Sequence, residues 1–201
     1  MDLNMERWPT DASIVSFEEG NPDENPWING KPQKEEIKVE TYNPRWAEQY
    51  EIRKAEINAA VPGRLGIEHV GSTAVPGLPA KPVIDIDLIV PDPELEGEYV
   101  PVLQGLGYEL TIRERSWYQH RMLRREEPRV NLHVFGPACP EHARHILFRD
   151  WLREQPADRK RYAEAKMLAK DGVTTAHDYN RRKQDVVLDI YQEIFKSRGW
   201  I

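Results

Sequence analysis

The stretch that decides the fold reads Ile67-Glu68-His69-Val70-Gly71-Ser72-Thr73-Ala74-Val75-Pro76-Gly77-Leu78-Pro79-Ala80-Lys81-Pro82-Val83-Ile84-Asp85-Ile86-Asp87. Its first four residues predict a short strand, and Gly71-Ser72 predicts a turn directly after that strand. Three prolines and a glycine fill residues 76–82, so this part must be a loop or a single turn. Val83–Val90 is apolar enough to predict a strand in the middle of a sheet. The stretch therefore indicates a strand, a turn, a loop and a second strand.

Two acids, Asp85 and Asp87, lie on the second strand. Because side chains alternate along a strand, both carboxylates project from one face, about 6–7 Å apart at the backbone. Like charges in an apolar setting are costly unless a cation joins them, and hard oxygen ligands suit magnesium. Without a metal, we expect the pKa of at least one of the two to be raised. The alternative, one aspartate capping a turn and the other facing solvent, is the better reading of Asp-x-Asp taken alone.

The turn after the first strand favours the metal reading. Glycine at position 71 allows positive φ and a close approach of the backbone to a ligand. Backbone amides over Gly71–Thr73, together with the Ser72 hydroxyl, can hold phosphate oxygens. Twelve residues separate Ser72 from Asp85, so the two motifs are expected to meet at one edge of a sheet. Lys81, in the loop between them, either contacts a phosphate or is a solvated turn residue.

The quoted run resembles the signature of GrpB proteins. Three other segments share the resemblance, which extends over about residues 38–198: Tyr42-Asn43-Pro44-Arg45-Trp46, Asn131-Leu132-His133-Val134-Phe135 and Phe148-Arg149-Asp150-Trp151-Leu152-Arg153. GrpB proteins are similar to the nucleotidyltransferase superfamily, in which a Gly-Ser turn holds a nucleoside triphosphate and three acids bind Mg²⁺. The resemblance therefore implies an α+β, nucleotidyltransferase-like mixed sheet with packed helices. It also implies Asp85 and Asp87 as catalytic metal ligands, and Gly71, Ser72, Thr73 and Lys81 as nucleotide-binding residues.

The third acid of that superfamily has no counterpart on the expected strand Val130–Phe135, which offers Asn131 and His133 instead. His133 could serve as the base that activates a hydroxyl, because imidazole has a pKa near 6.5. It could equally be a buried, hydrogen-bonded histidine.

Two functions are compatible with these residues. One is a magnesium-dependent nucleotidyltransferase acting on an unknown acceptor. The other is a non-catalytic accessory domain that retains the fold, as in GrpB-like domains fused to dephospho-coenzyme A kinase.

The rest of the chain predicts an α+β domain over residues 37–201, preceded by an extension over residues 1–36. Strands and strand–helix connections come first and helices come last, which is typical of this class. Further strands are expected at 37–42, 108–113, 117–123 and 130–135, and helices at 46–60, 93–106, 140–154, 156–169 and 176–198. Tyr118 and His120 either form a face that stacks on a nucleotide or belong to an ordinary surface strand. Arg149 and the pair Tyr162 and Lys166 match patterns in the helical region of the family that the chain resembles, and the pair shares one helix face.

The extension carries the net charge of the chain. Residues 1–36 hold nine acids and three bases, which accounts for the whole formal charge of −6. A neutral body lacks the basic footprint of a protein that binds duplex nucleic acid. Trp8, Phe17 and Trp27 give the extension something to bury, and a short strand is expected at Ala12–Phe17. We expect either an arm that packs on the body or on a protein partner, including a second subunit, or a mobile tail.

The composition is that of a soluble globular protein, with 39% hydrophobic and 31% charged residues. No apolar run approaches the ~20 residues that span a bilayer, and the first residues do not resemble a signal peptide. Cys139 is the only cysteine, so no internal disulfide can form. A cytoplasmic protein that does not contact membranes is the default expectation.

Overall fold

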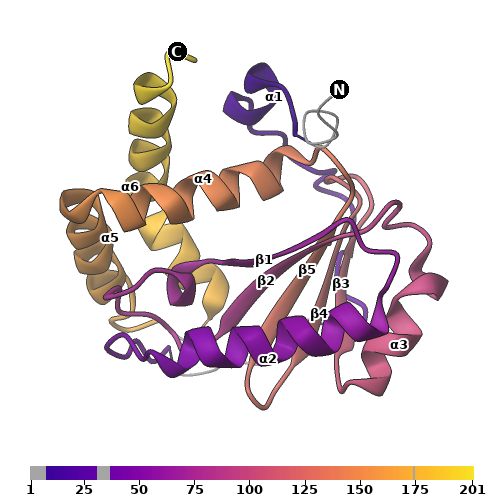
Figure 1. The fold of residues 1–201 in the computed structure, drawn as a ribbon. Coiled ribbons are helices and arrows are strands. Elements are labelled where there is room, and N and C mark those ends of the chain that lie inside the picture. The colour runs from indigo at the N-terminus through magenta and orange to yellow at the C-terminus, as the bar shows by residue number, and fades with distance from the viewer. Residues whose placement is uncertain (1–7, 31–36, 174) are drawn as a thin grey trace.

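The computed structural model describes residues 8–30, 37–173 and 175–201. Its elements in chain order are α1 (Asp11–Val15), α2 (Arg45–Ala60), β1 (Gly66–Val70), η2 (Ser72–Ala74), β2 (Ile84–Ile89), η3 (Glu96–Glu98), α3 (Val100–Gly105), β3 (Glu109–Glu114), β4 (His120–Arg125), β5 (Val130–Phe135), α4 (Pro140–Glu154), α5 (Pro156–Ala169) and α6 (Ala176–Ser197). Figure 1 shows α2 and α3 against one face of a single sheet, with α4, α5 and α6 grouped on the other side. The expected α+β class is confirmed.

The sheet is mixed, and its strands lie in the order β1-β2-β5-β4-β3. Only β2 and β5 run parallel, and the other neighbours are antiparallel. The register places Asp85 beside Asn131 and Asp87 beside His133. On the other side of β2, Val70 at the end of β1 is the partner of Asp85. The last strand in the chain therefore lies in the middle of the sheet, next to the strand that carries both acids.

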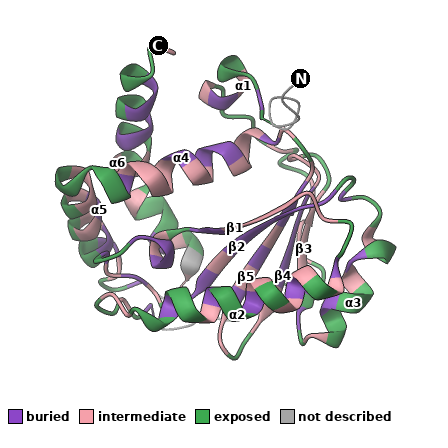
Figure 2. Cartoon of the chain, viewed as in Figure 1, coloured by how far each residue is buried: buried purple, intermediate pink, exposed green. Residues whose placement is uncertain are grey.

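Alternation along β2 and β5 separates an apolar face from a polar face. Ile84, Ile86 and Leu88 of β2 are fully buried with Leu132 and Val134 of β5. Trp46 and Ile57 of α2 and Leu103 of α3 belong to the same core, which appears as the buried centre of the sheet in Figure 2. Because neighbouring side chains point to opposite faces, Asp85, Asp87, Asn131 and His133 lie on the side of α4.

A second core lies among α4, α5 and α6 and includes Leu147, Tyr162 and Ile190. Val75 and Leu78, from the loop between β1 and β2, pack into it, and so does Ile14 of α1. Phe17 adds an edge-on contact with Tyr191, with ring centroids 5.6 Å apart. Over the described residues 8–30, the extension is therefore an arm packed on its own body.

Most predicted elements are confirmed, the strand expected at 117–123 is shifted to β4 because Tyr118 and Gln119 form a turn with positive φ, and three further predictions need correction. Residues 11–15 form a helix and not a strand, because the Thr10 side chain accepts a hydrogen bond from the amide of Ser13 and so caps that helix. The strand expected at 37–42 is reduced, in its described part, to one bridge between Glu40 and Ala80. The helix expected at 93–106 is split into η3 and α3. The expected boundary at residue 36 falls outside the described residues.

In the described part of the chain, no helix is both long enough and apolar enough to cross a membrane.

Candidate functional site

The Gly-Ser turn and the first aspartate meet directly. Gly71 has a φ of +69°, and a Cβ built on it would lie 2.6 Å from Oδ2 of Asp85. A side chain at this position would therefore collide with the carboxylate, and L-residues rarely adopt this φ. Ser72 follows at the start of η2. The prediction that the two motifs meet at one edge of the sheet is confirmed.

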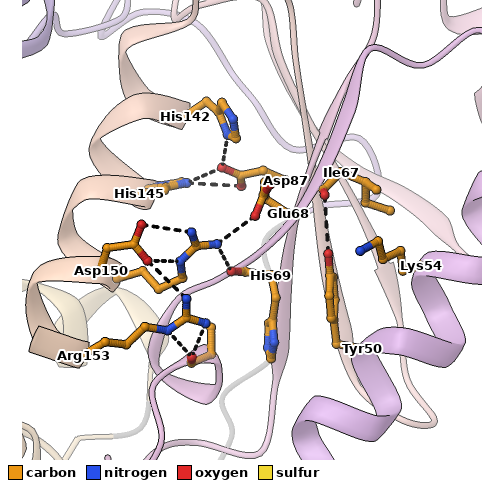
Figure 3. A network of polar contacts seen from close by, with 12 residues as sticks. Tyr50, Lys54, Ile67, Glu68, His69, Asp87, His142, His145, Asp150 and Arg153 are labelled. Atoms are coloured by element: carbon orange, nitrogen blue, oxygen red, sulfur yellow. Dashed lines mark hydrogen bonds and ion pairs between the residues drawn. The ribbon is translucent and has the colours of Figure 1, made fainter. Parts of the chain in front are cut away.

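Helix α4 braces this turn from outside. Arg149 donates to the carbonyl of His69 at 2.9 Å and to Oε2 of Glu68 at 2.8 Å. One helical turn further, Arg153 donates to the carbonyl of Ala74 at 3.0 and 2.8 Å. Figure 3 shows the guanidinium group of Arg153 reaching from α4 toward the turn. The two arginines thus hold the backbone on either side of Gly71.

The side chain of Thr73 ties the turn to neighbouring residues through hydrogen bonds within the protein. Its hydroxyl donates to the carbonyl of Val83 at 3.0 Å and lies 3.0 Å from Nε2 of His69. The ring of His69 is stacked on Tyr50 of α2, with centroids 4.6 Å apart. The Thr73 side chain is therefore buried and engaged within the protein, away from Asp85. Of the predicted phosphate-binding residues, the structure places Gly71 against the acid and Ser72 next in the chain, whereas the Thr73 hydroxyl is bound to Val83.

Asp85 is partly accessible, with 29% of its side chain exposed. Its Oδ1 accepts from the amide nitrogen of Asn131 at 3.0 Å and lies 3.9 Å from Nε2 of His133. Burial raises the pKa of Asp85, but His133 and Asn131 outweigh this effect and hold the pKa below its usual value. The amide oxygen of Asn131 is buried without a hydrogen-bond partner.

Asp87 has a different environment, because two histidines of α4 hold it. Its carboxylate is fully buried. It accepts hydrogen bonds from Nδ1 of His142 at 2.8 Å and from Nδ1 of His145 at 2.9 and 3.1 Å. Figure 3 shows both rings pointing at this carboxylate. Burial raises the pKa of Asp87, but the two imidazoles outweigh burial and hold the pKa far below its usual value. The expectation of a raised pKa in this acidic pair is therefore wrong, because hydrogen bonds from the two histidines to Asp87 and from Asn131 to Asp85 stabilise the ionised carboxylates.

The histidine contacts continue into the arm. His145 also lies 3.4 Å from Oε1 of Glu141, so it sits between two carboxylates, and they raise its pKa well above the usual value although burial lowers it. Glu141 in turn binds the buried Arg144 at 2.7 Å. Arg144 donates to the carbonyls of Ser13, Ile14 and Ser16 at the end of α1. An unbroken polar network therefore links Asp87 to the N-terminal arm.

The two candidate lysines belong to the loop between β1 and β2 and to the helix that binds this loop. Lys81 is half-buried in the segment that leads into β2. Lys166 of α5 is almost fully buried and donates to the carbonyl of Pro79 at 2.6 Å, which ties the same loop to the helices. Burial lowers the pKa of Lys166 well below its usual value. The expected shared face of Tyr162 and Lys166 is confirmed, with the ammonium 5.3 Å from the ring centroid.

The site fits a cation at Asp85 better than one held by both aspartates. Asp85 offers an accessible carboxylate, and the neighbouring Asn131 offers an unpartnered amide oxygen. Both oxygens of Asp87 are engaged by imidazoles, so a cation reaches them only after His142 and His145 turn away. Among the residues that the structure describes, no group of three or more His, Cys, Asp or Glu side chains is arranged to hold a metal ion.

His142 and His145 are the site residues that the sequence analysis missed. They lie three apart at the start of α4, hence on one face of that helix. The many lysines and arginines of this region dominate its sequence pattern, and its histidines do not stand out. Pro140 at the start of the helix and the spacing of the two histidines were available as signals. The contact with Asp87 was not, because it depends on where α4 crosses the sheet.

The fold and site define a class of α+β protein in which a Gly-Ser turn lies against an aspartate on a central strand. The comparisons give the family. The model of the GrpB protein family matches residues 36–193, and this chain belongs to that family. It is 41% identical to a UPF0157 protein of Halalkalibacterium halodurans, over 80% of this chain and 83% of that protein. It is 38% identical to a UPF0157 protein of Streptomyces coelicolor, over 81% of this chain and 87% of that protein. The predicted family membership is therefore confirmed.

A solved structure agrees with this assignment. The crystal structure of the conserved protein GrpB from Enterococcus faecalis matches with a TM-score of 0.62 and 27% identity, covering 77% of this chain and 99% of that chain. A cytoplasmic RNA terminal U-transferase matches with a TM-score of 0.45 and 10% identity, which is too distant to bear on this chain.

Proposed function

We propose that this chain binds a nucleoside triphosphate together with Mg²⁺ beside Gly71, Ser72 and Asp85, and transfers its nucleotidyl group to an acceptor hydroxyl. One observation carries the proposal: the backbone of Gly71 lies against the Asp85 carboxylate, with room for no side chain between them. A turn able to hold phosphate oxygens and a carboxylate able to hold a cation are thus in contact. Magnesium commonly bridges one or two carboxylates to substrate phosphates.

Each residue of the site has a separate task in this reaction. The turn amides and the Ser72 hydroxyl hold the phosphates, and Asp85 holds the cation that accompanies them. Magnesium, when bound, neutralises charge that develops on the phosphate oxygens. His133 accepts the proton of the acceptor hydroxyl, whose oxygen forms a bond to the α-phosphorus as the bond to pyrophosphate breaks. Asp87 remains paired with His142 and His145 and fixes α4 over the site.

Calorimetric titration with nucleoside triphosphates, with and without Mg²⁺, tests the proposal. We expect binding heat for the wild type in the presence of magnesium and its loss in Asp85→Ala. Asp189→Ala is the matched control, because it removes an acid that is 66% exposed on α6. This control should bind as the wild type does. A wild type that gives no heat with any of the common nucleotides would overturn the proposal.

A non-catalytic accessory role is the second candidate. It is favoured by the full engagement of Asp87 with two histidines and by Asn131 in the place of a third acid. Under this role the nucleotide is bound and left intact. Mass spectrometry after long incubation with nucleotide and magnesium distinguishes the two. Released pyrophosphate or a nucleotidylated chain favours the enzyme, whereas intact nucleotide and unmodified protein favour the accessory role.

A further inference from the structure

A chain of hydrogen bonds leads from His133 across the sheet to an acid on another strand. Nδ1 of His133 lies 3.0 Å from Nε2 of His120, and Nδ1 of His120 lies 2.7 Å from Oε2 of Glu114. Glu114 ends β3 and His120 begins β4, where the two are direct partners. The rings of His120 and His133 are stacked with centroids 5.2 Å apart, and His120 also stacks on Phe135 at 4.9 Å. Both imidazoles are therefore held in fixed orientations.

These contacts determine where the ring protons lie. An ionised carboxylate only accepts hydrogen bonds, so the short contact with Glu114 requires a proton on Nδ1 of His120. Burial lowers the pKa of His120, which keeps the ring neutral and leaves its Nε2 without a proton. That nitrogen accepts from Nδ1 of His133, so the neutral ring of His133 carries no proton on Nε2, and a proton taken up there faces Asp85. The bare nitrogen lies 3.9 Å from Oδ1 of Asp85, too far for a direct hydrogen bond.

We infer that Glu114 and His120 are positioning residues that hold His133 in the tautomer whose unprotonated Nε2 faces Asp85. The inference rests on the proposed function, in which His133 is the base. Strand β5 does not carry the third acid of the superfamily. Glu114 supplies a negative charge in its place, and His120 and His133 connect this charge to the site.

In the proposed reaction, one proton moves from the acceptor hydroxyl to His133. The O–H bond of the acceptor breaks, an N–H bond forms at Nε2 of His133, and the oxygen keeps the electron pair with which it attacks phosphorus. The positive charge now on His133 is shared through its Nδ1–H with His120 and is stabilised by the Glu114 carboxylate. A bare nitrogen directed at the acceptor, and a carboxylate behind it, are what a general base requires.

Nitrogen-15 NMR of the histidine-labelled full chain tests this arrangement without any nucleotide. The chain has six histidines, and the His133→Gln variant assigns the resonances of His133. At an alkaline pH at which further base no longer moves the His133 resonances, we expect Nδ1 of His133 at the shift of a protonated nitrogen and Nε2 at that of an unprotonated one. Glu114→Ala should convert this single tautomer into a mixture, so that both resonances move toward each other.

Two controls keep the result interpretable. Glu114 is 32% exposed, so we expect the Glu114→Ala chain to keep its fold, with a lower melting temperature because the buried His120 loses its partner. Glu126→Ala removes an exposed acid from the turn after β4 and should leave the His133 resonances where they are. A protonated Nε2 in the wild type, or resonances unmoved by Glu114→Ala, would overturn the inference. An ordered tautomer in a chain that binds no nucleotide would support this inference while overturning the proposed function.

Discussion

Gly71 is the residue at which the backbone and the carboxylate of the site come closest, and Gly77 is its natural control. Both have positive φ, +69° and +79°, but a Cβ at Gly77 would meet nothing within 4 Å. We expect Gly77→Ala to lower the free energy of unfolding by about 1–2 kcal/mol, the cost of a side chain at such φ. Gly71→Ala should cost more and should also abolish nucleotide binding, since it displaces Asp85. Urea unfolding and calorimetry measure both effects, and equal losses in the two variants would contradict this view.

His69 is the residue that should make the protein sensitive to mild acid. Burial lowers its pKa to about 4, whereas an imidazole in the unfolded chain has a pKa near 6.5. Between these values the unfolded chain binds a proton that the folded chain does not. Stability is therefore present above pH 6.5 and is lost as pH falls toward 4, by roughly 3 kcal/mol in all.

His69→Gln should flatten this part of the stability profile. We would measure urea unfolding from pH 4 to pH 7 for the wild type and for His69→Gln. His177→Gln is the control, because His177 is exposed on α6, and it should keep the wild-type slope. Parallel profiles for the wild type and His69→Gln would show that burial of His69 is not the cause.

Helix α4 is the element that positions the site, because it supplies both the arginines that brace the turn and the histidines that hold Asp87. Arg149→Ala would leave the carbonyl of His69 and the half-exposed Glu68 without their partner. We expect a loss of about 2–3 kcal/mol in the free energy of unfolding. Amide exchange should also quicken over residues 70–75. Arg181→Ala, which removes an arginine that is 71% exposed, should change stability by less than about 0.5 kcal/mol. Unchanged exchange at the turn in Arg149→Ala would contradict the bracing role.

The elements themselves could largely be predicted from the sequence, and the contacts between them could not. Proline at the first position of α4 and of α5 marks where each helix begins. Alternation along Val130–Phe135 gave the bounds of β5. The helix at 11–15 was missed because its formation depends on the Thr10 cap and on packing of Ile14. His142 and His145 were missed for the related reason that no local pattern reports which helix will lie over Asp87.

At the scale of the whole molecule, the arm and the body form one folded unit. Ile14 is fully buried among the C-terminal helices, while Ile28, also in the arm, is 38% exposed. We expect Ile14→Ala to lower the free energy of unfolding by about 2–4 kcal/mol through the cavity it leaves. Ile28→Ala should cost well under half of that. Thermal unfolding of both variants measures the two losses. If both variants lose similarly little stability, the arm does not stabilise the body.

The position of β5 has a consequence for how the protein is made. This strand lies between β2 and β4, yet it leaves the ribosome after both of them. A nascent chain that stops short of Val130 can pair β1 with β2 and β3 with β4, but these two hairpins have no strand to join them. Asn131 and His133 reach Asp85 only when β5 inserts, and α4 follows still later. The site is therefore assembled only after β5 and α4 have been made, and chains that stop short of Val130 lack two of the side chains that surround Asp85.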